Sequence, residues 1–228
     1  MLLVALMRIL KLLLSFRLKV NVIGRENIPE NGPVVVCFNH TDILDPLYIM
    51  FALMKDMWAL VASSYSENIF VRFLHKMGKV ILVDRSTVDM DALNKSIVVL
   101  KAGKFLGVSP EGTRSKDGLL RKGKFGLGYL AGMTDSTILP LGIVESFKAS
   151  KKMLKQNLKQ KIEVTVNIGE PFKLVNIEDL KSGFPQETTE EDKKNTMIFL
   201  RKWRDVTNSQ IMPRIAQLIP KGMRGDFE

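Results

Sequence analysis

Residues 39–46 read NHTDILDP and follow directly after the apolar run Val34–Phe38. The apolar run predicts a buried strand, and the dipeptide Asp-Pro predicts the start of a helix, where both residue types are favoured. His40 would then end a strand, and Asp45 would cap a helix. On one continuous helix their side chains would point about 140° apart, so they can meet only across a strand, a loop and a helix. An imidazole with a carboxylate partner can remove a proton from an alcohol.

This pattern alone leaves two interpretations open. In the first, His40 and Asp45 are a catalytic pair. In the second, Asp45 only caps the helix and His40 is an incidental polar residue at the end of a strand. Thr41 and Asp42 are expected to be turn formers that stabilise the loop between the two.

Short apolar runs rich in β-branched residues alternate along the chain with longer segments of helical period, which predicts an α/β sheet. We expect strands at residues 18–23, 33–38, 57–62, 79–83, 104–108, 137–144 and 162–169. We expect helices at residues 46–55, 68–77, 88–101 and 125–133, and a last one from Thr188, where Thr188 and Glu191 fit a capping box, toward Ser209. Pro213 and Pro220 should then break up the tail, and residues 181–190 are polar enough for a loop.

The chain of 228 residues is long enough for one sizeable domain. We predict a single α/β domain at residues 20–228, with a mixed, mostly parallel central sheet flanked by helices, preceded by an amphipathic helix at residues 1–19. The chain has one cysteine, Cys37, and two histidines, so it offers neither a disulfide framework nor the usual ligands of a zinc site. We expect Cys37 to be a small buried apolar residue.

The first nineteen residues are mostly apolar, but their longest uncharged run after the initiator is the six residues Leu2–Met7. A bilayer span needs about 20 such residues. At about 100° per residue, the polar side chains apart from Arg17 fall within one arc of roughly 80°, which is typical of a helix lying in the lipid headgroup plane. These residues are Arg8, Lys11, Ser15 and Lys19. The alternatives are an uncleaved signal peptide and an ordinary helix packed on the core.

The chain carries 34 Lys and Arg against 24 Asp and Glu, a net charge of +10. One cluster of cations precedes the first acidic residue, Glu26, and a second lies within residues 148–161. Such clusters bind polyanions. The sequence contains no zinc finger and no aromatic run flanked by Arg and Gly, which argues against nucleic acid. We therefore expect anionic lipid, because the cations of the first cluster are interleaved with leucines.

A second polar stretch, Ser109–Ser115, reads SPEGTRS and follows the apolar run Phe105–Val108. Arg114 suits a phosphate, because its planar guanidinium donates two parallel hydrogen bonds and stays charged. Glu111 would repel a phosphate, so it would orient an arginine or accept a hydrogen bond from a substrate hydroxyl. The alternative is a surface ion pair between Glu111 and Arg114. Arg85, which follows another strand-like run, matters only where the fold brings it toward Arg114.

Taken together, these segments resemble the 1-acylglycerol-3-phosphate acyltransferases, also called lysophosphatidic acid acyltransferases. The family carries four ordered blocks, and the match spans about residues 20–170. The matching segments are Asn39-His40 with Asp45, Gly78–Arg85, Ser109–Ser115 and Ile138–Gly142, the last with Pro140 inside an apolar strand. Two departures are Ser109, where the family usually has Phe, and residues 61–64, which lack a lysine often found after the third strand.

The resemblance implies that His40, held in one tautomer by Asp45, removes the proton from the sn-2 hydroxyl of lysophosphatidic acid. The alkoxide would attack an acyl thioester, acyl-ACP or acyl-CoA, and give phosphatidic acid without an acyl-enzyme and without a cofactor or metal. The implied substrate-binding residues are Lys79, Arg85, Glu111, Gly112, Thr113 and Arg114, and the implied structural residues are Asn39, Pro110 and Pro140.

The implied partners are a phospholipid membrane surface, lysophosphatidic acid and the acyl carrier protein or CoA thioester, and not nucleic acid. The implied location is the cytoplasmic face of a bacterial inner membrane, as a monotopic or peripheral protein. Three alternatives remain open at this point. The first is the same chemistry on glycerol 3-phosphate, lysophosphatidylethanolamine or a lyso-ornithine lipid. The second is a thioesterase, and the third is a non-catalytic lipid-binding protein.

Overall fold

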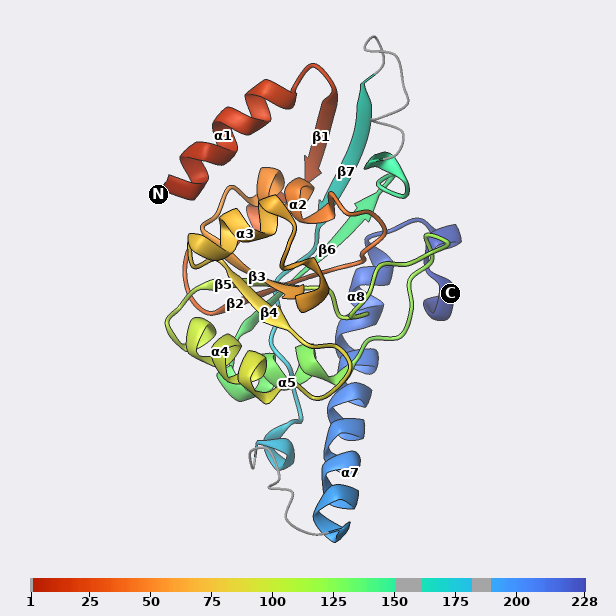
Figure 1. Ribbon diagram of the computed structural model, residues 1–228. Coiled ribbons are helices and arrows are strands. Elements are labelled where there is room, and N and C mark those ends of the chain that lie inside the picture. The colour runs from red at the N-terminus through yellow and green to blue at the C-terminus, as the bar shows by residue number, and fades with distance from the viewer. Residues whose placement is uncertain (1, 151–160, 182–189) are drawn as a thin grey trace.

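Strand β2 (Val34–Phe38) lies at the centre of a seven-stranded sheet, and all five of its residues are buried. The computed structural model describes residues 2–150, 161–181 and 190–228. The strand order is β1-β7-β6-β2-β5-β3-β4 (Figure 1). Every pair of neighbours is parallel except β6 and β7. The predicted fold class, a single α/β domain with a mixed, mostly parallel sheet, is therefore confirmed.

All seven predicted strands form, and their ends differ from the predicted ones by at most one residue. Besides β2, the strands are β1 (Leu18–Ile23), β3 (Met57–Ala62), β4 (Val80–Val83), β5 (Phe105–Val108), β6 (Thr137–Val144) and β7 (Ile162–Ile168). Runs of apolar, β-branched residues suit a sheet whose two faces are both covered.

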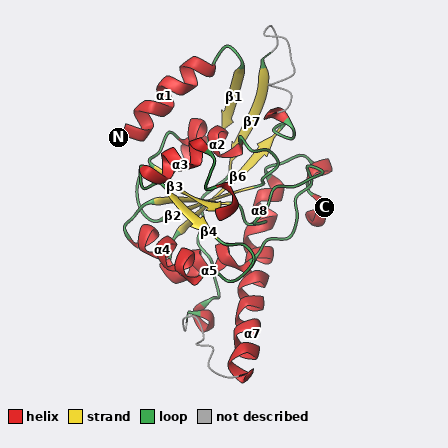
Figure 2. Cartoon of the chain, viewed as in Figure 1, coloured by secondary structure: helices red, strands yellow, loops and turns green. Residues whose placement is uncertain are grey.

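Two groups of helices cover the two faces of the sheet (Figures 1 and 2). Alternate residues of β2 supply both apolar cores: Val34 and Val36 face one core, and Val35 and Cys37 face the other. The first core includes residues of α1 (Leu2–Leu14), α2 (Asp45–Leu53) and α3 (Ile69–Lys76). The second includes residues of α4 (Met90–Lys101), α5 (Phe125–Thr134), α7 (Glu190–Val206) and α8 (Met212–Gln217).

The C-terminal region differs from the prediction at Pro213. One π-helical segment, Thr207–Ile211, connects α7 to α8, and Pro213 lies in the first turn of α8, where its missing N–H is not needed. Pro213 therefore does not interrupt the helical path, whereas Pro220 does follow the end of α8. The predicted capping residue Thr188 lies outside the described residues, as do most of the second basic cluster and of the predicted loop at residues 181–190.

Helix α1 packs on the core and also exposes apolar side chains. Its inner side includes the buried Leu3 and Met7, and Lys11 Nζ donates a hydrogen bond to the carbonyl of Phe51 at 3.2 Å. Burial lowers the pKa of Lys11, and the nearby charge of Arg25 lowers it further. Lys11 thus turns toward the protein, away from the predicted solvent-facing arc. The core-helix alternative therefore describes the inner side of α1 correctly. The helix ends at Leu14, short of the predicted residue 19, and Leu18 already belongs to β1.

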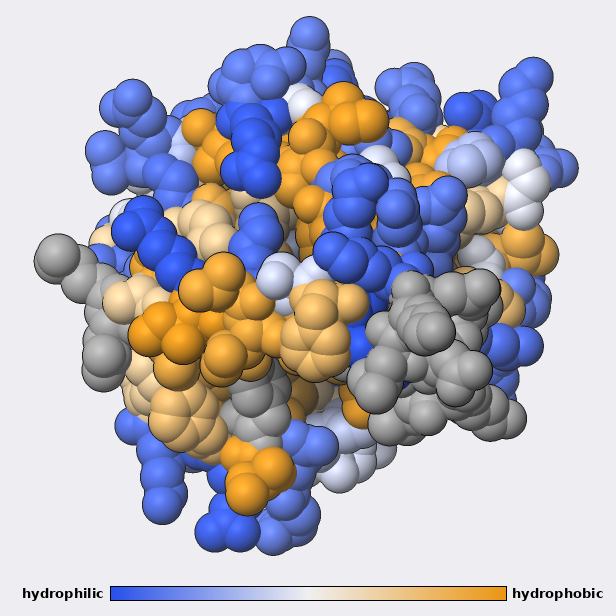
Figure 3. Space-filling model, turned by 90° about the horizontal axis from the view of Figure 1, so that it is seen from above, coloured by the Kyte–Doolittle hydropathy of each residue, from blue (hydrophilic) through white to orange (hydrophobic). Residues whose placement is uncertain are grey.

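The outer side of α1 is apolar as well. Seen from above, this end of the molecule carries apolar residues that gather on the left, with hydrophilic residues around them (Figure 3). The exposed apolar residues of α1 and of the turn after it are Ile9, Leu12, Leu13 and Phe16. Among the described residues, no helix combines the length and the apolar character that crossing a bilayer requires.

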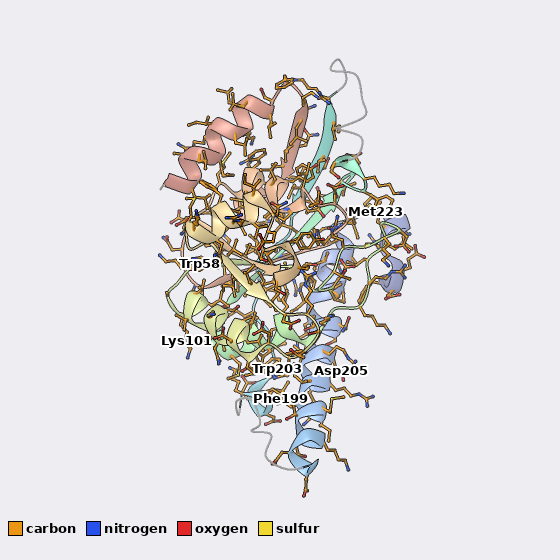
Figure 4. The ribbon with its side chains drawn as sticks, viewed as in Figure 1. Trp58, Lys101, Phe199, Trp203, Asp205 and Met223 are labelled. Carbon is orange, nitrogen blue, oxygen red and sulfur yellow. The ribbon has the colours of Figure 1, made fainter. Side chains whose placement is uncertain are left out.

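Trp203 joins α7 to α5 in the second core. Its fully buried ring meets those of Tyr129 and Phe199 edge-on, and it lies directly against α5 (Figure 4). A Cβ atom at Gly132 of α5 would lie 2.2 Å from the Trp203 ring. Only glycine therefore permits this contact between the two helices.

We predict that Gly132→Ala lowers the free energy of unfolding by about 2 kcal/mol, because the added methyl group overpacks a rigid buried ring. Gly126→Ala, in the same helix, is the matched control, since nothing lies within 4 Å of its added Cβ. Urea unfolding of the two variants and the parent protein measures the difference. Equal stability of the two variants would show that α7 can move away from α5 at little cost.

Candidate active site

His40 and Asp45 are in direct contact at the end of β2. Asp45 Oδ2 lies 2.9 Å from His40 Nδ1, and it also accepts hydrogen bonds from the backbone N–H groups of Thr41 at 2.7 Å and Asp42 at 2.8 Å. Asp45 is completely buried. An ionised carboxylate can only accept, so Nδ1 carries the ring proton and Nε2 keeps its lone pair. This geometry is that of an oriented general base.

The predicted capping role of Asp45 was wrong. Leu44 is the N-cap residue of α2, and Asp45 is the first helical residue, with no side-chain bond to the helix N-terminus. Its carboxylate instead points back to the loop. The loop role of Asp42 is confirmed, because its carboxylate accepts from Leu44 N at 3.0 Å and from Ser150 Oγ at 2.7 Å.

The backbone of His40 is held by the 109–115 loop. Its N–H donates to Glu111 Oε1 at 3.2 Å, and its carbonyl accepts from Ser115 N at 2.7 Å. The preceding residue, Asn39, makes two side-chain bonds to the backbone of Ile143 in β6, accepting from the N–H at 2.7 Å and donating to the carbonyl at 2.9 Å. These bonds extend the pairing of β2 with β6 by one residue and support the structural role predicted for Asn39.

Glu111 lies behind the site rather than in it. Its buried carboxylate accepts from the backbone N–H groups of His40 and Arg121 and makes neither a hydrogen bond nor an ion pair with Arg114. The structure therefore supports neither an arginine clamp nor a surface ion pair. Burial raises the pKa of Glu111 to about 7, although the two N–H groups favour the ionised form. The sequence could not indicate this role, because both partners are backbone groups.

Two guanidinium groups, Arg85 and Arg114, lie near each other. Burial lowers the pKa of Arg85, the phenol of Tyr65 raises it, and the charge of Arg114 lowers it. Arg114 Nη2 donates to Tyr65 Oη at 2.8 Å, with the guanidinium carbon 5.9 Å from the centre of the tyrosine ring. The fold therefore brings Arg85 toward Arg114, as the phosphate hypothesis requires, and adds Tyr65, which the sequence analysis missed.

The direction of the strands explains this convergence. Strands β2, β3, β4 and β5 are mutually parallel, so their carboxyl ends lie at one edge of the sheet. His40, Tyr65, Arg85 and Arg114 follow these four strands in the chain. Ligand sites of open α/β sheets lie at this edge. That rule was the signal that could have identified Tyr65.

All four side chains line one cavity of about 950 Å³. Much of the remaining lining is apolar and comes from α1, α2, α3 and the neighbouring strands. The apolar residues include Leu3, Leu10, Leu14, Phe38, Ile49, Met50, Met57, Leu60, Val71, Leu74 and Val80. The cavity thus joins a cationic end, which also carries the candidate base, to a long apolar region.

The other predicted substrate-binding residues differ in their placement. Gly112 and Thr113 line the cavity, whereas Glu111 is not among its lining residues. Lys79 also lines it, but its ammonium group pairs with Asp56 at 2.7 Å. Its role in binding substrate stays a prediction. Lys124, which the sequence analysis did not single out, lines the cavity and packs along Gly112.

The two prolines are placed as structural residues. The carbonyl of Pro110 accepts from Lys124 N at 2.8 Å, which holds the 109–115 loop to the start of α5. Pro140 lies inside β6, in the interval between the bridge of Ile138 to Phe172 and the first β7 pair, Leu141 with Ile168. Proline is tolerated in a central strand at such an interruption of the ladder.

The family model described as Acyltransferase matches residues 19–144, more than half of the chain, and this range includes His40, Asp45, Tyr65, Arg85 and Arg114. The chain belongs to the acyltransferase family. Two curated relatives are named 1-acyl-sn-glycerol-3-phosphate acyltransferase. One, from Borreliella burgdorferi, is 32% identical over 126 residues, which are 54% of this chain and 50% of that protein. The other, from Bacillus subtilis, is 25% identical over 165 residues, which are 72% of this chain and 78% of that protein.

A chloroplastic member of the family from Arabidopsis thaliana, also named 1-acyl-sn-glycerol-3-phosphate acyltransferase, is 29% identical over 57% of this chain and 37% of its own length. The chain thus spans half or less of the Borreliella and Arabidopsis proteins. The crystal structure of the 1-acyl-sn-glycerophosphate acyltransferase from Thermotoga maritima is similar with a TM-score of 0.53 and 23% identity, covering 85% of this chain and 73% of that one. This similarity shows that the acyltransferase fold is shared.

We predict a pH-dependent stability difference between the parent protein and Glu111→Gln. The pKa of Glu111 is about 7 in the folded protein, against a reference value of 4.5. Below pH 4.5 the group is protonated in both states. As pH rises from 4.5 to 7, the unfolded chain ionises first, so the parent loses stability relative to the variant, on the order of 3 kcal/mol.

Urea unfolding of both proteins between pH 5 and pH 8 measures this difference. Comparison with the variant cancels the contributions of the other titrating groups. A stability difference that is constant over this range would show that Glu111 ionises normally in the folded protein.

Proposed function

We propose that this protein transfers an acyl group from an acyl thioester to the sn-2 hydroxyl of lysophosphatidic acid, giving phosphatidic acid. One observation carries the proposal: an oriented imidazole and two neighbouring guanidinium groups line the same cavity, which continues into an apolar region. A lipid with a phosphate, a free hydroxyl and an acyl chain matches these three parts. The names of the relatives support the same reaction.

His40 acts first as the base. Its Nε2 takes the proton of the sn-2 hydroxyl, and the developing imidazolium is stabilised by Asp45. The alkoxide oxygen attacks the thioester carbonyl and forms a tetrahedral intermediate. The C–S bond then breaks, and the leaving thiolate takes the proton from His40, so the base is restored after each turnover.

The acyl group passes directly between the two substrates. Cys37, the one thiol of the chain, is fully buried inside β2, and burial raises its pKa. A buried thiol of this kind is a poor nucleophile. The proposed reaction therefore forms no acyl-enzyme on Cys37, and it uses the side chains described above without a cofactor.

Arg85 and Arg114 bind the phosphate of the acceptor. Two guanidinium groups near each other repel, and a phosphate dianion between them removes this repulsion while accepting charge-assisted hydrogen bonds. Tyr65 holds Arg114 through its oxygen, so its own O–H remains available as a further donor. Anchoring the phosphate aligns the hydroxyl with His40, and such alignment typically supplies a large part of the rate enhancement.

The acceptor and the product are both membrane lipids, so we propose that the protein works at a membrane surface. The exposed apolar side of α1 supports a peripheral or monotopic attachment. We propose the cytoplasmic face of a bacterial inner membrane as the location. The acyl donor, acyl-ACP or acyl-CoA, then arrives from the aqueous side.

The proposed reaction is tested by mass spectrometry of the product formed from lysophosphatidic acid and acyl-CoA or acyl-ACP. We predict that His40→Ala lowers kcat by about a thousandfold or more, because the variant lacks the oriented base. Asp45→Asn should lower kcat less than His40→Ala does, since the imidazole remains but is less well stabilised as imidazolium. His75→Ala, which alters the one other histidine, is the control. Parent-like turnover by a folded His40→Ala protein would refute the role of His40.

We predict that Arg114→Ala chiefly raises the KM for lysophosphatidic acid, by about tenfold or more, and that Tyr65→Phe raises it about fivefold. Tyr65 acts partly through Arg114, so adding Tyr65→Phe to Arg114→Ala should have less effect than it has alone. Tyr129→Phe removes the same atom from a ring packed between α5 and α7 and is the matched control. An acceptor KM that is unchanged in Arg114→Ala would exclude a phosphate-binding role.

A further inference from the structure

Helix α3 has two apolar sides. On its inner side, Val71 and Leu74 line the cavity that holds the candidate site. On its outer side, Ile69 is 85% exposed and Phe73 is 45% exposed. Exposing large apolar side chains to water is unfavourable in free energy, and surfaces on which they gather mark interaction sites.

Helix α1 repeats the same arrangement. Leu10 and Leu14 line the same cavity from this helix, while Leu12 is 74% exposed on its outer side. The two helices therefore both line one cavity, and both expose apolar side chains on their outer sides. A lipid that moved past either helix into the cavity would stay in contact with apolar side chains.

The charges around these helices favour an anionic lipid surface. Neither α1 nor α3 contains an acidic residue. Arg8 on α1 and Arg72 and Lys76 on α3 are exposed, and the first acid before α3, Glu67, lies outside the helix. Exposed apolar residues bordered by cations are typical of segments that lie in the headgroup region of anionic membranes, where each cation adds about 1 kcal/mol or less.

We propose that α3 is a second membrane-docking element, which enters an anionic bilayer surface together with α1 and lets the lipid acceptor pass from the bilayer into the cavity. The part of this inference that concerns the acceptor rests on the proposed function, whereas the docking does not. The occupant of the face is an anionic lipid surface, because exposed apolar side chains bordered by cations on two helices without an acidic residue complement such a surface.

Sedimentation with vesicles tests the docking. The probe is a set of vesicles made of phosphatidylcholine with about one third phosphatidylglycerol. We expect Ile69→Asp to weaken vesicle binding about tenfold or more, because a charge replaces an apolar side chain that would be buried in the bilayer. Val98→Asp on α4 is the matched control: Val98 is 68% exposed, does not line the cavity and should leave binding unchanged.

Two results of this experiment would overturn the proposal. One is vesicle binding by Ile69→Asp that equals that of the parent. The other is a parent protein that is dimeric in analytical ultracentrifugation, together with a monomeric Ile69→Asp variant that still binds vesicles, because a second copy would then cover this face.

An acyl-transfer assay with two acceptors separates an effect of Ile69→Asp on docking from an effect on the chemistry. With the acceptor embedded in the same vesicles, kcat/KM of Ile69→Asp should fall in parallel with vesicle binding. With a short-chain acceptor that is monomeric in water, it should stay at the parent value. An equal loss with both acceptors would make Ile69 a structural residue and would refute the docking role. Sedimentation decides the docking even where no acyl transfer is found, so the failure of the proposed function is a separate result.

Discussion

The buried carboxylate of Asp45 is the constraint on which the site depends. A carboxylate without water or hydrogen-bond partners costs several kcal/mol, so a fold that buries one has to supply donors. All the donors to its Oδ2 come from residues 40–42: the ring of His40 and two backbone N–H groups. The loop satisfies Oδ2 of Asp45 in the conformation that makes these three bonds. That conformation also orients the imidazole, so stability of the loop and orientation of the base follow from the same bonds.

The rest of the site follows from strand direction. Because β2 to β5 run parallel, four loops that are far apart in the sequence open at one edge of the sheet. One supplies the base, one supplies Tyr65, and two supply the guanidinium groups. Helices α1 and α3 then close the apolar part of the cavity beside this edge. The fold thereby separates a polar region, where charges are held by short loops, from an apolar region whose walls are helices.

The sequence predicted most of the fold because its signals are local. The seven strands and most helices are set by apolar runs and their flanking turns, and their ends agree within one or two residues. The contact of His40 with Asp45 was also within reach, since it spans five residues. The contact of Arg114 with Tyr65 spans 49 residues and that of Glu111 with His40 spans 71, so both depend on the order of strands in the sheet. Pro213 was misjudged because proline has opposite effects inside a helix and in its first turn.

The bonds between the 109–115 loop and the backbone of His40 have a consequence for regiochemistry. Ser115, which follows Arg114 in the chain, holds the carbonyl of His40, and Glu111 holds its N–H. The backbone segments that carry the imidazole and the guanidinium of Arg114, which we propose anchors the acceptor, are therefore bonded together, and this limits the separation of the two groups. For an acceptor bound as proposed, this separation determines which hydroxyl can reach the base. A hydroxyl on the glycerol carbon next to the phosphate-bearing one meets the base, whereas the hydroxyl of the positional isomer, one carbon farther away, does not.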